Sequence, residues 1–256
     1  MGAGTESSSL MFGDLIRWFG ESPDILEQVG RHLYLSYVPA VAALLVALPI
    51  GLYIGHKRRF GFIAVTLANL GRAIPSFAIL SLALILFLEM GIGIGGDFGF
   101  WPTFAALFFL SVPPILVNTD VGIRGVDRDT VEAARGSGFS EWGVLSRIEL
   151  PLAAPLIVAG LRTAAVQSVA TATLGAFVGS GGLGDYIRLG IRTHNYDTLL
   201  GGAILVALLA IGTEFGLGVV ERLLRPKTSA ASKQRRSKTG PLTDVAHTRR
   251  GGGLAT

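Results

Sequence analysis

Five long runs of apolar residues constrain the fold of this chain more than any other feature of its sequence. Each run holds at most one charged residue, and a helix needs about 20 apolar residues to cross a membrane. We therefore predict an all-α integral membrane protein, built as one domain with five transmembrane helices. The predicted spans cover residues 33–55, 60–88, 101–119, 150–175 and 198–220.

The composition agrees with a membrane protein. Half of the residues are hydrophobic, only 16% are charged and the mean hydropathy is +0.55, whereas soluble domains are about one quarter charged. A large soluble protein could bury such runs as core helices, but a chain of 256 residues would then keep too little polar surface. Cysteine is absent, so the chain can form neither a disulfide nor a thiolate metal site.

Two segments of different character flank the predicted transmembrane domain, which covers residues 31–222. Residues 1–30 lack the basic start and apolar core of a signal peptide, and residues 11–19 repeat apolar side chains at helical spacing. We place this lead-in outside, either as a short interfacial helix or as a loosely ordered segment. Residues 223–256 are rich in Ser, Gly, Lys and Arg, which predicts a disordered basic tail, solvated or touching anionic lipid.

The uneven distribution of basic residues among the loops sets the orientation of the chain in the membrane. If residues 57–59 lie inside, five alternating spans also put the segment 124–149 and the tail inside. Sixteen of the 22 Lys and Arg residues then lie inside, four lie outside and two lie within spans. We therefore predict that the N-terminus is outside and the C-terminus inside.

The polar segment 124–149, here called the insert, separates two apolar runs. Its local pattern predicts two short helices. Asp129 and Glu132 can form a capping box at the first helix, and Gly138 lies at the bend where that helix has ended. Ser140 can cap the second helix. Pro151 then opens the next span, where a proline in the first helical turn costs little.

One spacing within the insert resembles the "EAA" cytoplasmic loop of ATP-binding-cassette importer permeases. The resemblance implies that the insert is a pair of coupling helices that docks into a groove of an ATPase subunit. The alternative from the residues alone is a capped amphipathic connector in which Glu132 only caps a helix. The matching residues are Glu132, Ala133, Ala134, Gly138, Ile148, Leu150 and Pro151.

Longer segments are similar to the permeases that import glycine betaine, carnitine, choline and related osmoprotectants. These segments are residues 69–80, 112–123 and 175–191, and residues 179–185 are also similar to methionine-type permeases. The chain departs from the osmoprotectant pattern at Arg72, where a glutamine is common. Because an arginine does not suit a cationic solute passing close by, an amino acid or another small solute remains an alternative.

The resemblance implies a MetI-like, type I importer permease fold and a place in the inner membrane of a bacterium. It also implies several partners: a second permease chain, identical or related, two cytoplasmic ATPase subunits and an extracytoplasmic solute-binding protein. The chain would bind no cofactor and catalyse no reaction, because ATP and Mg²⁺ belong to the ATPase subunits. No partnership with nucleic acid is expected.

Five residues in the spans are candidates for the translocation pathway, because polar or helix-breaking residues inside a membrane are functional candidates by default. Each has a structural alternative: an arginine can pair with a carboxylate, and hydroxyl and amide groups can join neighbouring helices. A proline can kink its helix, and we prefer one kinked span over residues 60–88 to a broken pair. The five are Arg72, Pro75, Arg162, Gln167 and Thr171.

A glycine-rich stretch follows the fourth span. Glycines at this density permit positive φ angles and a close approach of backbone segments. The stretch lacks the Gly-Lys-Ser/Thr ending of a phosphate-binding loop. We predict a tight external loop beside the gate, formed by Gly179, Gly181, Gly182, Gly184 and Asp185.

Two other classes of protein were weighed against an importer permease. An intramembrane enzyme is disfavoured because the four histidines contain no pair at i, i+4 metal spacing and none lies in a predicted span. An ion-coupled secondary carrier is disfavoured because such proteins tend to have mid-membrane acids and internal repeats, and the sequence shows neither.

Overall fold

The computed structural model describes residues 17–20, 22, 24–59, 61–62, 66, 75–91 and 98–225. These residues are helical, joined by short turns, and contain no strand. Most of the predicted lead-in, residues 1–16, and nearly all of the predicted tail, residues 226–256, lie outside the described residues. The chain divides into two units at Leu224, and the fold below is that of the first.

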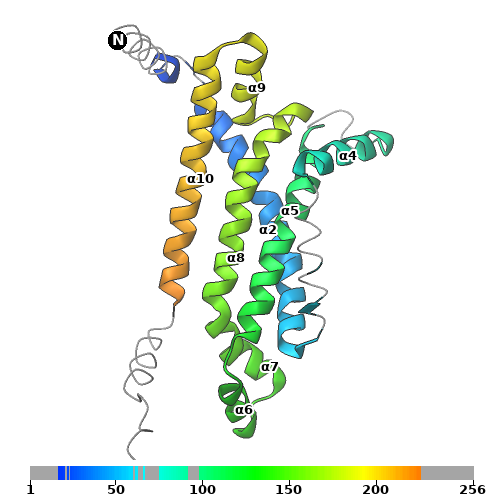
Figure 1. The fold of residues 1–256 in the computed structure, drawn as a ribbon, viewed down its shortest axis with the longest axis vertical. Coiled ribbons are helices and arrows are strands. Elements are labelled where there is room, and N and C mark those ends of the chain that lie inside the picture. Colours follow the sequence, from blue (N-terminus) through cyan, green and yellow to red (C-terminus); the bar gives the residue numbers. More distant parts are fainter. Residues whose placement is uncertain are drawn as a thin grey trace, which may run out of the picture. The chain divides into compact units, whose positions relative to one another are not determined.

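Long helices run along the molecule and form a bundle (Figure 1). Four helical segments in the described part of the chain are long and apolar enough to cross a membrane, which agrees with four of the five predicted spans. The total of five stays a prediction. The four helices are α2 (Ile25–Lys57), α5 (Phe100–Arg124), α8 (Leu150–Thr171) and α10 (Tyr196–Leu224).

The second predicted span contains a break at Pro75. This residue has an extended backbone, with φ −60° and ψ 128°, and α4 (Ser76–Glu89) begins directly after it. The preference for one kinked helix is therefore wrong at this position, because helical backbone does not continue through Pro75. The 14 residues of α4 rise about 21 Å, less than the roughly 30 Å of a bilayer core.

Small residues allow the long helices to pack closely. Helix α2 packs on α5, α5 on α8, and α8 on α10, and the central core contains three alanines together with Ile115 and Leu116. At Gly160 of α8, an added Cβ would lie only 2.7 Å from the Cβ of Asn118 and 2.8 Å from the carbonyl oxygen of Pro114. Such close contacts are the usual basis of helix association in a membrane, because the hydrophobic effect contributes little to the association of helices in lipid.

Five shorter elements lie at the two ends of the bundle. One end, the insert end, contains α6 (Arg128–Gly136) and α7 (Glu141–Val144) at the bottom of Figure 1. The other, the loop end, contains α9 (Gly184–Thr193) at the top. Helix α8 is entered through a π-helical turn, η1 (Leu145–Glu149), and continues into a 3₁₀ segment, η2 (Ala172–Val178).

Candidate functional site

The insert folds as two short helices joined by a bend, as predicted. Helix α6 ends at Gly136. Gly138 has a φ of +86°, a backbone conformation that residues with a Cβ atom rarely adopt. The Ser140 hydroxyl accepts a hydrogen bond from the Gly143 backbone N–H over 3.2 Å, which confirms Ser140 as the cap of α7.

The predicted capping box at the start of α6 is wrong. The helix begins at Arg128, with Asp127 at the N-cap position and no side-chain hydrogen bond to the helix backbone. Asp129 already lies in the first helical turn and therefore cannot be the cap. The Asp127 carboxylate instead accepts a hydrogen bond from the Thr130 hydroxyl over 3.3 Å.

The residues of the EAA spacing divide between the inside and the outside of the insert. Ala134 is buried in a small apolar core that the insert forms with Val126, Val131 and Val144, and Ile148 packs against it. The Ala134 methyl group therefore stabilises the insert itself and does not offer a surface to a partner. Glu132 and Ala133 are exposed, Leu150 is half-buried and Pro151 is exposed.

The outer side of the insert contains a hollow with an aromatic residue at its edge. The hollow has a volume of about 420 Å³. The Trp142 side chain is 75% exposed, and Phe139 is also exposed. The one signal of this surface in the sequence was a tryptophan, Trp142, within a short polar segment, and sequence reasoning missed it. The lining residues are Ser137, Gly138, Phe139, Ser140, Trp142, Gly143, Ser146 and Arg147.

A charged cluster fixes the inner side of the insert to the end of α2. The Nδ1 atom of His56 is in hydrogen-bond contact with Glu149, and its Nε2 atom lies 2.9 Å from a carboxylate oxygen of Glu141. Glu141 in turn accepts two hydrogen bonds from Arg135, of 3.0 and 3.1 Å. Sequence reasoning missed this cluster, because 93 residues separate His56 from Glu149 and no local pattern joins them.

The glycine-rich stretch at the loop end forms a tight turn, as predicted. Gly179, Gly181 and Gly182 all have positive φ angles. Gly184 begins α9 and is buried, and a Cβ there would lie 2.4 Å from the Thr173 carbonyl oxygen. Asp185 pairs with Arg188 over 3.1 Å, within the same helix.

Side chains near the start of α2 hold this loop in place. The Arg31 guanidinium donates a hydrogen bond to the Ser180 carbonyl oxygen over 2.7 Å. The Gly182 N–H donates to the side-chain oxygen of Gln28 over 3.0 Å. The Tyr186 hydroxyl donates to Asp24 over 2.7 Å; burial, and then this carboxylate, raise the pKa of the Tyr186 phenol. The loop is therefore an anchored element of the bundle.

The pathway candidates have different surroundings. Arg162 lies 3.3 Å from Glu214 and also 3.3 Å from Glu221, both on α10, so its predicted structural alternative has a physical partner. Gln167 is exposed and Thr171 half-buried, one helical turn apart on α8. Pro75 is exposed at the start of α4, and Arg72 lies outside the described residues.

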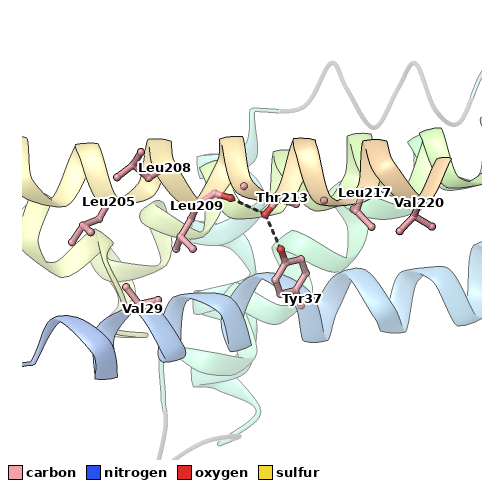
Figure 2. Close-up of a pocket in the computed structure, with 10 residues that line it drawn as sticks. Val29, Tyr37, Leu205, Leu208, Leu209, Thr213, Leu217 and Val220 are labelled. Atoms are coloured by element: carbon pink, nitrogen blue, oxygen red, sulfur yellow. Dashed lines mark hydrogen bonds between the residues drawn. The ribbon is translucent and has the colours of Figure 1, made fainter. Parts of the chain in front are cut away.

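An apolar groove of about 530 Å³ lies between α2 and α10 (Figure 2). The Tyr37 hydroxyl crosses it and lies 2.7 Å from the Thr213 hydroxyl, which donates to the Leu209 carbonyl oxygen (Figure 2). Val29 of α2 and leucine, valine and glycine residues of α10 line the rest of the groove. Among the described residues, no group of three or more His, Asp or Glu side chains could hold a metal ion.

A bundle of long apolar helices, with a polar two-helix insert at one end and an anchored glycine loop at the other, defines a multi-span helical membrane protein. A family model described as "Binding-protein-dependent transport system inner membrane component" matches residues 47–228, and the chain belongs to this family. It is therefore a transport subunit rather than an enzyme, which excludes the two alternative classes considered above.

Curated relatives are similar to the chain over most of its length. The glycine betaine/carnitine/choline transport system permease protein OpuCB of Bacillus subtilis is 36% identical over 82% of this chain and 93% of its own. The carnitine transport permease protein OpuCB of Listeria monocytogenes is 34% identical, over 86% and 97% respectively. The choline transport system permease protein OpuBB of Bacillus subtilis is 37% identical, over 79% and 89%.

Solved structures of similar fold come from importers of amino acids. A chain of the MetNI methionine ABC transporter in an inward-facing conformation has a TM-score of 0.65 at 20% identity, covering 79% of this chain and 96% of its own. A chain of an amino acid ABC transporter solved with histidines has a TM-score of 0.62 at 17% identity, covering 81% and 97%. These likenesses confirm the MetI-like permease fold.

Proposed function

We propose that this chain is the permease subunit of an ATP-driven importer for quaternary-ammonium osmoprotectants such as glycine betaine, carnitine and choline. Family membership supports the importer. The solute class is supported by curated relatives that carry these solutes in their names, at 34–37% identity over most of the chain. The two structural neighbours named for amino acids are only 20% and 17% identical, so they support the fold but not an amino acid as solute.

In this proposal the insert is the contact with the ATPase, and the observation that carries it is the shape of the insert. Two short helices meet at a positive-φ glycine, Gly138, and expose Trp142 beside a hollow. A buried apolar core and the His56 cluster hold this surface in one shape. An exposed aromatic side chain beside a concave surface is the common anatomy of a protein interface.

The orientation follows from the same assignment. The insert end faces the cytoplasm, where ATP is available, and the loop end faces outward. Helix α10 ends at Leu224 on the inner side, and the basic tail follows it. The glycine loop, anchored to α2 by Arg31 and Gln28, then lies beside the external gate, where a solute-binding protein would deliver its cargo.

The complete transporter would contain two permease chains and two ATPase subunits, which bind ATP and Mg²⁺. One such chain is too small to enclose a solute path with two alternating gates. ATP draws the ATPase subunits together, the two inserts follow, and the spans switch between inward- and outward-open states that ligands bias. In this scheme Arg72, Gln167 and Thr171 are pathway candidates. For Arg162 we favour a structural role, because two carboxylates of α10 face it.

The test is reconstitution of the chain with an ATPase subunit and a solute-binding protein that co-purify with it. Uptake of labelled glycine betaine, carnitine, choline and methionine into vesicles would be measured with ATP and with a non-hydrolysable analogue. The proposal predicts ATP-dependent uptake of at least one quaternary ammonium compound and none of methionine. Uptake of methionine alone would reassign the solute, and uptake driven by an ion gradient without ATP would overturn the importer.

A further inference from the structure

The charged cluster behind the insert joins elements that are distant in sequence. His56 belongs to the last turn of α2, Arg135 to α6, Glu141 to α7 and Glu149 to η1. The cluster is thus a polar connection between the first span and both halves of the insert, beside the hydrogen bonds from Arg58 to the Val126 carbonyl oxygen and from Arg124 to the Ile54 carbonyl oxygen. It borders a cavity of about 300 Å³ that is also lined by Glu132, the first residue of the EAA spacing.

The positions of the two ring nitrogens show which form of the His56 ring fits its surroundings. Both nitrogens face carboxylate oxygens: Nδ1 faces Glu149, and Nε2 lies 2.9 Å from Glu141. The second contact has the distance of an ion pair, although its angles fall outside those of a hydrogen bond. A neutral imidazole carries a hydrogen on only one nitrogen, so its other nitrogen would turn a lone pair toward a carboxylate.

Burial makes the charge of this histidine consequential. Glu149 is only 1% exposed, and a buried carboxylate costs several kcal/mol unless a positive partner compensates it. With His56 as imidazolium, the cluster contains two positive groups, including Arg135, and two negative groups. With a neutral ring it carries one net negative charge, and only Arg135 remains positive, bonded to the half-exposed Glu141.

We infer that His56 is a positioning residue for the coupling of ATP hydrolysis to solute transport. As an imidazolium, it holds the insert against the end of α2, so that the insert and α2 move together. The inference rests on the proposed function of the insert as the ATPase contact. Other charged groups near the ring line the same cavity: Lys57 and Arg58 beside it in sequence, and Arg128 and Glu132 of α6. The two partners of the ring itself are Glu141 and Glu149.

The first test measures the number of solute molecules imported per ATP hydrolysed, in vesicles containing the complete transporter. His56→Gln and Glu149→Gln should each lower this ratio at least fivefold while the ATPase subunit still co-purifies. The double variant should recover part of the loss, because it removes the buried carboxylate together with its partner. His194→Gln is the matched control, since His194 is exposed at the end of α9, and should leave the ratio unchanged.

A change of charge at position 56 separates a charged lock from ordinary packing. His56→Lys keeps a positive charge there and should retain more coupling than His56→Gln, which is neutral. If the shared proton instead resides on Glu149, the neutral mimic Glu149→Gln will keep full coupling. That result, or equal loss of coupling in His56→Lys and His56→Gln, would overturn the inference.

A second measurement does not depend on transport. Amide hydrogen exchange in residues 128–149 of the full-length chain, reconstituted in membrane, should be at least tenfold faster in His56→Gln than in the wild type at equal pH. Exchange in α5 and α8 should not change. If the insert exchanges equally fast in His56→Gln and in the wild type, the inference is overturned, even if the variant fails to transport. If exchange is faster in the variant but the wild type shows no ATP-driven uptake, only the proposed function is contradicted.

Discussion

Arg162 of α8 lies 3.3 Å from Glu221 of α10, and the Arg162 guanidinium also reaches Glu214 at the same distance. Because α8 and α10 pack on each other, this pairing helps to fix the rotation and register of one helix against the other. Glu221 is the more buried of the two carboxylates, and Glu214 is half-exposed. An ion pair inside a membrane domain is expensive to break when one partner stays buried.

We expect Arg162→Gln to destabilise the chain by about 1–2 kcal/mol, or roughly 2–8 °C in unfolding temperature, because Glu221 loses this contact. Glu214→Gln should have the smaller effect. Thermal unfolding of the purified chain would be followed for both variants, for Glu221→Gln and for the Arg162→Gln/Glu221→Gln double variant. Additive effects in this cycle would mean that the pair contributes no coupling energy.

The bend of the insert gives a second prediction. Gly138→Arg should abolish uptake while the chain still inserts in the membrane, because the φ of +86° disfavours any side chain and a long charged one obstructs the docking surface. Gly138→Ala separates the two causes. It adds only the backbone strain, about 1–2 kcal/mol, because no atom lies within 4 Å of an added Cβ.

The comparison requires uptake and co-purification of the ATPase for both Gly138 variants. Alanine should retain much of the uptake and the bound ATPase, whereas arginine should lose both. Equal loss with alanine would assign the defect to strain, and normal uptake with arginine would remove the insert from coupling.

A third prediction concerns orientation. A cysteine in place of Ser137 should react only with reagents on the cytoplasmic side, and a cysteine in place of Asn195 only with reagents outside. Both positions are exposed, on the insert and after α9 respectively. Ser180 would be a poor choice for the outer label, because it is fully buried. Reaction of both cysteines from one side would contradict the proposed topology and the ATPase contact with it.

A pair of glycines tests the packing of the spans. Gly160→Ala should lower stability by about 1–3 kcal/mol, because the new methyl group would meet Asn118 and the Pro114 carbonyl below 3.0 Å. Gly212→Ala is the matched control, since no atom lies within 4 Å of its added Cβ and alanine favours a helix over glycine. Denaturation in detergent would compare the two. Equal losses would show that close approach of α5 and α8 is not the reason for Gly160.

Sequence reasoning located four of the five predicted spans in agreement with the structure, because each of these four is a long apolar run, a signal that does not depend on partners. It also placed the bend at Gly138 and the cap at Ser140, because both effects act over a few residues. It failed at Asp129, because Asp127 and Asp129 could each take the N-cap position of α6, and the backbone geometry decides which of them does. It missed His56 and Glu149 altogether, because a contact between residues 93 positions apart leaves no local pattern.

The buried alanine of the EAA spacing shows a different limit. A small residue on an amphipathic helix is compatible with close approach of a partner or with a tight internal core, and composition does not separate the two. The arrangement of Val126, Val131 and Val144 around Ala134 decides in favour of the core. Pro75 was ambiguous for a similar reason, because a proline can kink a membrane helix or end it.

The π-helical turn at Leu145–Glu149 joins α7 to α8 without a break, so that the helical rod runs from Glu141 to Thr171 and rises about 45 Å. The second half of the insert is therefore a lever arm of the fourth span and not a tethered loop. The rotation of the proposed docking surface about the rod axis is set by that wider turn. Deleting one residue there would rotate this surface by roughly 100°.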